Sequence, residues 1–234
     1  MLTDKINTIK NEVAQCAKSC GRSSQEIKIL AVTKTHCADV IINSLKNGIE
    51  YIAESKVQEA EQKLPLLQGL YKEFHFIGHL QTNKINKLVT LKPTLIHSID
   101  KFVTAEKLNK ALKDINSPQD ILVEINTSGE VSKNGINPVD LFELLKKIDD
   151  LEYVRVKGMM TIGALTTDIP TIQKCFRICR EYFEKVKGNT YQHIKMEFLS
   201  MGMSSDFRIA IKEGSNIIRL GSIIYGERDY IKRS

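Results

Sequence analysis

The 234-residue chain contains no tryptophan, only 5 prolines and only 13 glycines. Collagen-like and low-complexity chains are much richer in proline and glycine, and disordered chains are poorer in apolar residues than this one, which is 42% hydrophobic. A chain of this length buries a sizeable core without disulfides or structural metals. The composition therefore predicts an ordinary globular protein.

Long apolar segments are also missing. No run of 18 apolar residues occurs, and Met1 to Lys5 open an amphipathic helix rather than a charged segment followed by an apolar core. We therefore expect neither a membrane-spanning helix nor a secretory signal, and we expect the protein to be cytoplasmic.

Runs of like charge do not occur either. The chain has 34 Lys and Arg residues and 28 Asp and Glu residues, which gives a formal net charge of +6. Acids follow bases closely, as where Lys146 and Lys147 precede Asp149 and Asp150. Because basic and aromatic residues do not alternate, a solvated surface explains the excess better than binding to nucleic acid or membrane.

The five cysteines form no zinc or disulfide pattern. Cys16 and Cys20 lie four residues apart within a helical pattern, and so do Cys175 and Cys179. This spacing lacks the C-x-x-C motif and the His partners of a zinc site, whereas reduced thiols on helix faces explain it. We expect no disulfide framework and no metal site.

Eight β-branched runs alternate with helical patterns along the chain. The predicted strands comprise residues 28–34, 50–54, 74–78, 94–100, 120–126, 154–162, 194–200 and 216–225. The helical patterns between them cover residues 38–47, 56–64, 81–89, 102–115, 139–148, 171–187 and 205–213. Continuous apolar strands joined by helices indicate a parallel sheet covered by those helices.

Eight such units predict the α/β class and a single (β/α)8 TIM barrel, with residues 1–234 forming one domain. An open doubly wound sheet is the alternative. No Gly-x-Gly-x-x-Gly follows the first strand, which weakens the interpretation as a dinucleotide-binding fold. Residues 2–20 form an extra N-terminal helix, which we expect to cover the bottom of the barrel.

Lys34 ends the first predicted strand, after the apolar run from Ile29 to Val32. Reactive groups of barrel enzymes lie at the C-terminal ends of the strands. Partial desolvation there lowers the pKa of a lysine and frees its amine to attack an aldehyde. The alternative is a lysine that merely ends a strand and extends its head into water.

Two segments near the seventh and eighth strands suit a phosphate group. Barrel phosphate sites lie at the loops after these strands, where this chain has LSMGMS (199–204) and RLGS (219–222). Glycine permits close approach of the backbone, and serine hydroxyls and backbone N–H groups bind a dianion. Either segment alone is a weak signal, because serine–glycine turns are common. Together, opposite Lys34, they form a more specific one.

An amine opposite a phosphate cradle describes a pyridoxal 5'-phosphate site. The aldehyde of this cofactor would form an internal aldimine with Lys34, and its phosphate would lie between residues 200–204 and 221–222. Arg219 has two interpretations. It pairs with the phosphate, or it lies at the pyridine nitrogen, where a cation keeps that nitrogen unprotonated and weakens the electron sink.

Other polar residues lie within or after the predicted strands. We expect three histidines to be buried, hydrogen-bonded structural residues rather than catalytic bases: His75, His79 and His97. Three further residues at strand ends either line the pocket or pack at its rim: Glu54, Asn126 and Met160. No pair of histidines has metal-ligand spacing with a carboxylate, so the sequence predicts no metal site.

Motifs in order along the chain carry a family resemblance. They are AVTKT (31–35), VQE (57–59), HFIG (75–78), LQTNK (80–84), IHSID (96–100), NTSGE (126–130), KNG (133–135), GMM (158–160), LSMGMS (199–204), RLGS (219–222) and YG (225–226). They resemble the pyridoxal phosphate homeostasis protein family (YggS/PROSC type), which is related to the N-terminal barrel of alanine racemase. The number and order of the motifs make the resemblance specific.

The resemblance implies a barrel like the N-terminal domain of alanine racemase, with pyridoxal 5'-phosphate bound covalently to Lys34. It implies phosphate contacts around five residues: Ser200, Met203, Ser204, Gly221 and Ser222. It also implies that Arg219 lies near the pyridine nitrogen. The chain departs from the family in one place, since it has Ala53-Glu54-Ser55 where the family usually has Gly-Glu-Asn, so that a hydroxyl replaces an amide.

Two functions compete for this site. The first is a non-enzymatic protein of intracellular vitamin B6 homeostasis that holds pyridoxal 5'-phosphate and releases it, with cofactor-dependent apoenzymes as partners. The second is an amino-acid racemase or lyase. Racemisation in two-domain relatives looks to require a tyrosine from beyond the barrel, and this chain ends soon after its last strand. We therefore expect no turnover, unless Tyr225 or Tyr230 substitutes.

Two remaining expectations concern a third function and the oligomeric state. A phosphosugar-binding barrel enzyme with Lys34 as Schiff-base former is a third class, but it does not explain the resemblance. We expect a monomer, because the periodicity of the sequence reveals no exposed apolar face.

Overall fold

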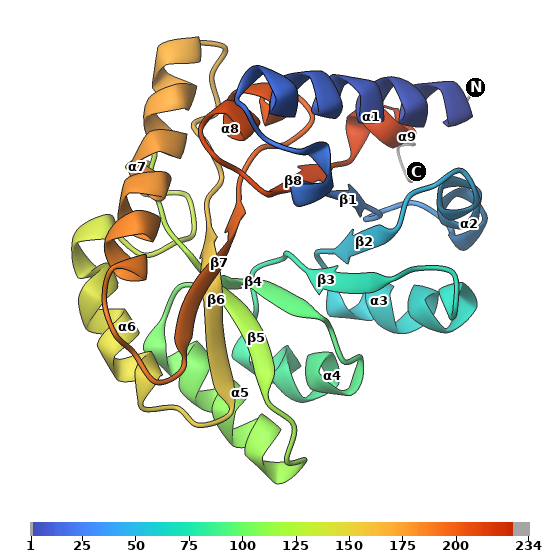
Figure 1. The fold of residues 1–234 in the computed structure, drawn as a ribbon. Helices are drawn as coiled ribbons and strands as arrows, with labels where there is room; N and C mark the ends of the chain where they lie inside the picture. The colour runs from blue at the N-terminus through green and yellow to red at the C-terminus, as the bar shows by residue number, and fades with distance from the viewer. Residues whose placement is uncertain (1, 227–234) are drawn as a thin grey trace.

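The computed structural model describes residues 2–226, which form a closed barrel of parallel strands (Figure 1). Each strand pairs with the next along the chain, and β8 pairs with β1 to close the barrel. The strands are β1 (Lys28–Val32), β2 (Tyr51–Glu54), β3 (Glu73–Phe76), β4 (Leu95–Ile99), β5 (Gln119–Glu124), β6 (Val154–Met160), β7 (Ile194–Ser200) and β8 (Ile217–Leu220). The predicted (β/α)8 barrel is confirmed, and the open sheet was the wrong alternative.

Helices form the outer layer around the strands (Figure 1). They are α1 (Leu2–Ser19), α2 (Ala38–Lys46), α3 (Val57–Lys63), α4 (Ile85–Thr90), α5 (Phe102–Asp114), α6 (Leu141–Asp149), α7 (Ile169–Lys187), α8 (Phe207–Lys212) and α9 (Ser222–Tyr225). Short 3-10 segments comprise η1 (Ser24–Glu26), η2 (Leu64–Leu67), η3 (Thr82–Lys84) and η4 (Pro138–Asp140). In α6, for example, Leu141, Leu144, Leu145 and Ile148 recur at helical spacing and are all buried.

Helix α1 lies in the ring of helices and does not cover the bottom of the barrel. It contacts α8, α9 and α2, and Figure 1 shows it alongside α8 and α9. Its buried residues Ile9 and Val13 belong to the same apolar cluster as Ala31 of β1 and Ile218 of β8. Helix α9 has only 4 residues and is too short to cover β8, so α1 completes the outer layer. The predicted position of α1 at the bottom of the barrel was wrong.

The last predicted strand, residues 216–225, divides into β8 and α9. Gly221 stands between them with φ −119° and ψ −80°. The backbone N–H groups of Gly221 and Ile223 both donate to the Ser204 hydroxyl, at 3.2 and 3.3 Å. Since these donors bind a side chain from another loop, they cannot continue a sheet ladder. The apolar run therefore turns into a helix after Leu220.

The interior of the barrel is only partly apolar. Leu30, Leu95 and Leu122 come from β1, β4 and β5 and share one small apolar cluster, which requires them to meet inside the barrel. Other buried residues of the strands are polar: His75, His97, Glu124, Ser200 and Arg219. Buried polar groups persist only when they are hydrogen-bonded or charge-compensated, so these residues are candidates for a function.

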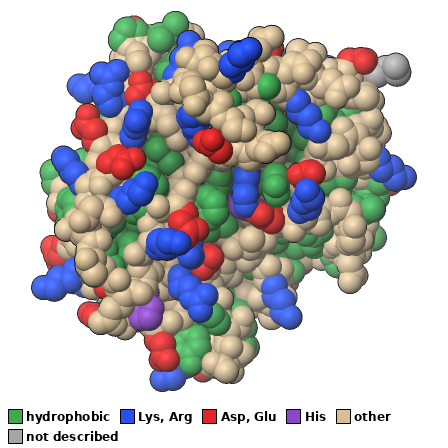
Figure 2. Space-filling view, viewed as in Figure 1, with side chains coloured by type: hydrophobic (Ala, Val, Ile, Leu, Met, Phe, Trp, Pro, Cys, Tyr) green, Lys and Arg blue, Asp and Glu red, His purple; other side chains and the backbone are tan. Residues whose placement is uncertain are grey.

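The surface carries mixed charge. Figure 2 shows Lys and Arg side chains next to Asp and Glu side chains over the face in view, which agrees with a solvated surface. Within residues 2–226, no helix combines the length and the apolar character needed to cross a membrane. Free thiols occur at Cys16, Cys20, Cys37, Cys175 and Cys179.

Candidate functional site

A pocket of about 360 Å³ lies at the C-terminal ends of the strands, where reactive groups of barrels lie. Six of the seven predicted cofactor-binding residues line it: Lys34, Met203, Ser204, Arg219, Gly221 and Ser222. These residues come from the loop after β1, the loop after β7, and β8 with the turn that follows it. The structure therefore brings the predicted amine and the predicted phosphate loops into one cavity.

Lys34 lies in the turn after β1, which ends at Val32, two residues earlier than the predicted strand. Its side chain is half-buried and forms part of the pocket wall. The next residue, Thr35, has a φ of 69°, a left-handed conformation that costs free energy in a residue other than glycine. Hydrogen bonds from neighbouring elements hold this turn.

Both neighbours of Lys34 are fixed by side chains of α3 and β2. Lys63 of α3 donates to the Thr33 carbonyl oxygen at 2.9 Å, and the Thr33 hydroxyl donates to Glu54 Oε1 at 2.6 Å. The Thr35 N–H donates to Glu59 Oε2 at 2.7 Å. Lys63 also pairs with both carboxylates, at 2.8 Å each. These four residues form a clamp on the Lys34 turn: Thr33, Glu54, Glu59 and Lys63.

The clamp includes residues that the sequence interpretation did not assign to the site. Glu59 and Lys63 are four residues apart on α3, a spacing that predicts an ion pair on one helix face but not its position beneath Lys34. Burial raises the pKa of Glu54 above its ordinary value, although hydrogen bonds from Lys63 and Thr33 oppose this effect. Glu54 Oε2 is fully buried and has no hydrogen-bond partner among the described residues.

The loop after β7 and the turn after β8 are joined by Ser204. Its hydroxyl accepts the N–H groups of Gly221 and Ile223, so the Gly221 N–H, which was expected to bind a phosphate, is already bonded to a serine oxygen. Gly202 has a φ of 94°, and a Cβ there would lie 2.5 Å from Ala210 Cβ, so only glycine fits. Asp206 accepts the Met203 N–H at 2.6 Å and fixes the other side of the loop.

Arg219 lies on β8 and is buried, with 4% of its surface exposed. Its guanidinium donates to Ser200 Oγ at 2.7 Å and to the Thr161 carbonyl oxygen at 2.9 Å. Burial lowers the pKa of Arg219, and the charges of Asp206 and Glu124 oppose this effect. A fixed cation therefore forms part of the wall of the pocket.

Ser200, the seventh predicted residue, is fully buried and does not line the pocket. Its hydroxyl lies between His97 and Arg219, so it acts on the pocket through Arg219. Met160 and Ser55 line the pocket. Asn126 instead holds its own loop by donating to the Glu130 carbonyl oxygen at 2.9 Å.

The remaining candidates divide in the same way. His75 and His97 are buried and hydrogen-bonded to each other at 2.9 Å, as expected for structural residues. His79 is exposed, so the prediction that it is buried was wrong. Tyr225 does not line the pocket, because its hydroxyl lies 2.9 Å from Ser44 Oγ. Tyr230 lies outside the described residues.

Comparison with known proteins places the chain in a family. Residues 6–229 match the family model described as alanine racemase, N-terminal domain. The pyridoxal phosphate homeostasis protein of Aquifex aeolicus (strain VF5) is 35% identical over 227 residues, which cover 97% of this chain and 98% of the relative. The chain belongs to the pyridoxal phosphate homeostasis protein family. The relative of that name from Escherichia coli (strain K12) is 35% identical, and the match covers 99% of both proteins.

Solved structures show the same barrel as this homeostasis-family protein. PipY of Synechococcus elongatus PCC7942, in a structure described as having PLP bound, has a TM-score of 0.84 and 26% identity and covers 97% of this chain and 100% of PipY. An alanine racemase of Clostridium difficile 630 has a TM-score of 0.75 at 19% identity, over 97% of this chain and 56% of the racemase. The second likeness concerns the fold alone, and it confirms the barrel type.

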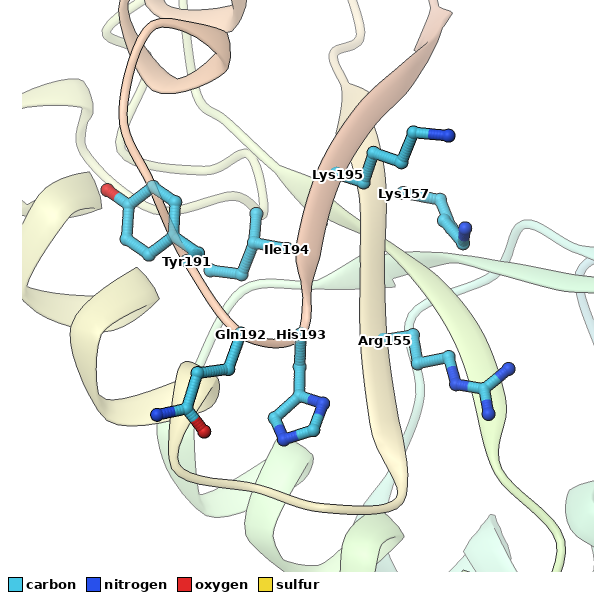
Figure 3. Close-up of a pocket in the computed structure, with 7 residues that line it drawn as sticks. All are labelled: Arg155, Lys157, Tyr191, Gln192, His193, Ile194 and Lys195. Carbon is cyan, nitrogen blue, oxygen red and sulfur yellow. The ribbon is translucent and has the colours of Figure 1, made fainter.

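A second pocket, also about 360 Å³, is lined by Arg155 and Lys157 of β6, the first two residues of β7 and the turn before β7 (Figure 3). Lys157 and Lys195 project from these neighbouring strands (Figure 3), and both pair with Glu197, at 3.3 and 2.9 Å. One carboxylate thus compensates part of the charge of these two cations. This pocket lies at the strand starts and contains none of the predicted site residues.

A buried carboxyl group, that of Glu124, lies on β5 next to Met160, which lines the pocket that contains Lys34. Glu124 ends β5, and burial together with the nearby charge of Asp100 raises its pKa to about 7, although Arg219 opposes the shift. The sequence interpretation did not single out Glu124. Its only signal is its place at a strand end, which many rim residues share.

Proposed function

We propose that this protein binds pyridoxal 5'-phosphate, holds it as a Schiff base on Lys34 and serves intracellular vitamin B6 homeostasis. The main observation behind the proposal is that Lys34 lines the same pocket as Ser204, in the loop after β7, and Gly221, in the turn after β8. Family membership supports it, because the relatives of Aquifex aeolicus and Escherichia coli are named pyridoxal phosphate homeostasis proteins. The PLP-bound structure of PipY supports it further.

The residues of the pocket fit the chemistry of this cofactor. The primary amine of Lys34 suits the aldehyde, with which it would condense with loss of one water. The hydroxyl groups of Ser204 and Ser222 suit a phosphate dianion, because Ser204 Oγ accepts the Gly221 N–H and can still donate its own proton. Arg219 supplies a fixed cation for the ring side of the cofactor, and the apolar side chain of Met203 borders the same space.

Each residue then has a defined task. When bound, the cofactor supplies an aldehyde carbon and an electron-accepting ring. The clamp of Thr33, Glu54, Glu59 and Lys63 orients the turn that carries Lys34. Ser204 holds the two phosphate loops together, whereas Ser200 acts on the cofactor by holding Arg219.

A role in holding and releasing the cofactor fits better than amino-acid turnover. Racemisation needs a second acid–base group at the reacting carbon, within hydrogen-bond reach. Among the described residues, the tyrosine considered for this task, Tyr225, is turned toward Ser44, and burial raises its pKa to about 12. We infer a cytoplasmic monomer that exchanges cofactor with dependent apoenzymes.

Absorbance spectroscopy tests the proposal. Purified protein mixed with pyridoxal 5'-phosphate should develop the visible band of a lysine-linked cofactor, and borohydride reduction followed by peptide mapping should place the label on Lys34. Lys34→Ala should abolish the band, whereas Lys56→Ala, which removes an exposed lysine, should retain it. A wild-type protein that stays colourless with added cofactor would refute the proposal. Sustained α-proton exchange of an amino acid at enzyme-like rates would refute the non-enzymatic role.

A further inference from the structure

Arg219 lies at the pocket end of a series of buried hydrogen bonds, which we call the hydrogen-bond chain. Its guanidinium donates to Ser200 Oγ at 2.7 Å, and Ser200 Oγ lies 3.0 Å from His97 Nδ1. Ser200 and His97 are both completely buried. Since they come from β7 and β4, which are not neighbours in the barrel, the contact crosses the barrel interior.

The chain continues from His97 to the start of the strands. His97 Nε2 lies 2.9 Å from His75 Nδ1, and His75 Nε2 lies 2.8 Å from Glu73 Oε2. Glu73 in turn forms an ion pair with Lys28 at 2.6 Å. Side chains of five strands, β1, β3, β4, β7 and β8, thus connect the two ends of the barrel.

Glu73 and Arg219, at the two ends of the hydrogen-bond chain, determine which atom donates in every bond between them. Glu73 is ionised, because hydrogen bonds from His75 and Lys28 lower its pKa to about 2, and an ionised carboxylate only accepts. His75 must therefore donate from Nε2. If the ring is neutral, its Nδ1 accepts, and His97 must donate from Nε2.

The same reasoning applies at the Arg219 end. A neutral His97 that donates from Nε2 has a bare Nδ1, which accepts the Ser200 hydroxyl proton. The lone pairs of Ser200 Oγ are then available to Arg219, which can only donate. Every donor meets an acceptor, and no other assignment of neutral rings satisfies all four bonds.

Neutral rings agree with the surroundings of both histidines. Burial lowers the pKa of His75 and lowers that of His97 well below the ordinary value. The charged groups that act on the pair are Lys28, Glu73 and Arg219, and only Glu73 favours a charged ring. That carboxylate is already compensated by Lys28.

We propose that His97 and His75 are positioning residues that hold Arg219 in the pocket wall through this one-way chain of hydrogen bonds. The chain leaves Ser200 no freedom to turn, so the guanidinium keeps one orientation toward the pocket. The significance of that orientation for a bound pyridine ring rests on the function proposed above. The arrangement of the hydrogen bonds does not depend on that function, and it can be measured without cofactor.

Nitrogen-15 NMR of the cofactor-free protein tests the chain directly. We expect His75 and His97 to show neutral rings protonated at Nε2 at pH 7.5, since both are buried and hydrogen-bonded through both ring nitrogens. Detection of an Nδ1–H form, or of a charged ring at pH 7.5, for either histidine would overturn the proposal. A colourless protein with this NMR result would refute only the proposed function.

Variants test whether the chain positions Arg219. His97→Leu should replace the slowly exchanging, resolved Arg219 guanidinium signals by averaged ones, whereas His97→Gln, which keeps an acceptor and a donor, should restore them at least partly. If His97→Leu does not fold, Ser200→Ala cuts the same chain by removing one hydroxyl. His79→Ala is the matched exposed control.

The same variants should alter the spectrum of bound cofactor. The visible band should shift in His97→Leu and Ser200→Ala and stay at the wild-type position in His97→Gln and His79→Ala. If folded His97→Leu and Ser200→Ala both keep the resolved Arg219 signals, the positioning role is wrong. An unchanged band in both variants, in protein that still binds cofactor, would also overturn it.

Discussion

Lys63 donates a hydrogen bond to the carbonyl oxygen of Thr33 at 2.9 Å, directly before Lys34. The same ammonium group binds Glu54 and Glu59, so all three of its donors are used. Glu59 in turn accepts the N–H of Thr35. A helix residue thus determines the shape of the turn that presents the reactive amine, and this relationship has a measurable consequence.

Lys63→Met should destabilise the protein by about 3–5 kcal/mol, because it leaves the buried charge of Glu54 without its partner. Urea unfolding monitored by circular dichroism measures the effect. Adding Glu54→Gln to Lys63→Met should recover part of the loss, since no buried charge then remains. Lys56→Met removes an exposed partner of Glu59 and should change stability by no more than about 0.5 kcal/mol. Equal effects of the two lysine variants would contradict the clamp.

Ser204→Ala should weaken binding of pyridoxal 5'-phosphate about tenfold, the loss expected for one hydrogen bond to a charged group. Binding of pyridoxal, which has no phosphate, should stay unchanged. Fluorescence or absorbance titration with the two ligands measures the ratio. Ser24→Ala, in η1 before β1, is the control. Parallel losses for both ligands would show that Ser204 acts on the fold of the loop and not on the phosphate.

Glu124 predicts a pH dependence of stability. Its pKa is about 7 in the folded protein and 4.5 ordinarily, so the folded state binds more protons than the unfolded state between these values. The free energy of unfolding should therefore fall as the pH rises through this window, by roughly 3 kcal/mol in total. Glu124→Gln should remove this part of the dependence. The comparison is made by urea unfolding of both proteins at pH 4.5 and pH 7.5, and identical slopes would contradict the raised pKa.

Gly158→Ala should destabilise the barrel severely. A Cβ at this position of β6 would lie 1.8 Å from the carbonyl oxygen of Phe198 in β7, with a φ of 155°. Backbone atoms of the barrel cannot move far enough, so we expect a loss of at least about 4 kcal/mol or no folded protein. Gly69→Ala also has a positive φ, 78°, but open space around it, so about 1–2 kcal/mol is expected. Thermal unfolding distinguishes the two, and a mild effect of Gly158→Ala would contradict the tight contact.

The alternation of apolar runs and helical patterns predicted the barrel, because strand and helix periods are local properties of the chain. The same reasoning misplaced α1 and extended the last strand to residue 225. Both errors depend on contacts between distant segments. Helix α1 takes its place because α9 is short, and the chain leaves the sheet at Gly221 because Ser204 binds the N–H groups there.

For the site, the order of residues along the chain was enough to predict which groups carry the chemistry. Lys34, Ser204 and Gly221 were recognisable because barrels place such residues at strand ends. How these groups are held became visible in the folded barrel. The clamp on Lys34 and the chain from Lys28 to Arg219 join residues far apart in sequence, and no local pattern marks them. The end of a strand can be predicted from local sequence, because strand periodicity is a local property. A buried hydrogen bond between distant residues cannot, because its two partners come within reach only when the barrel closes.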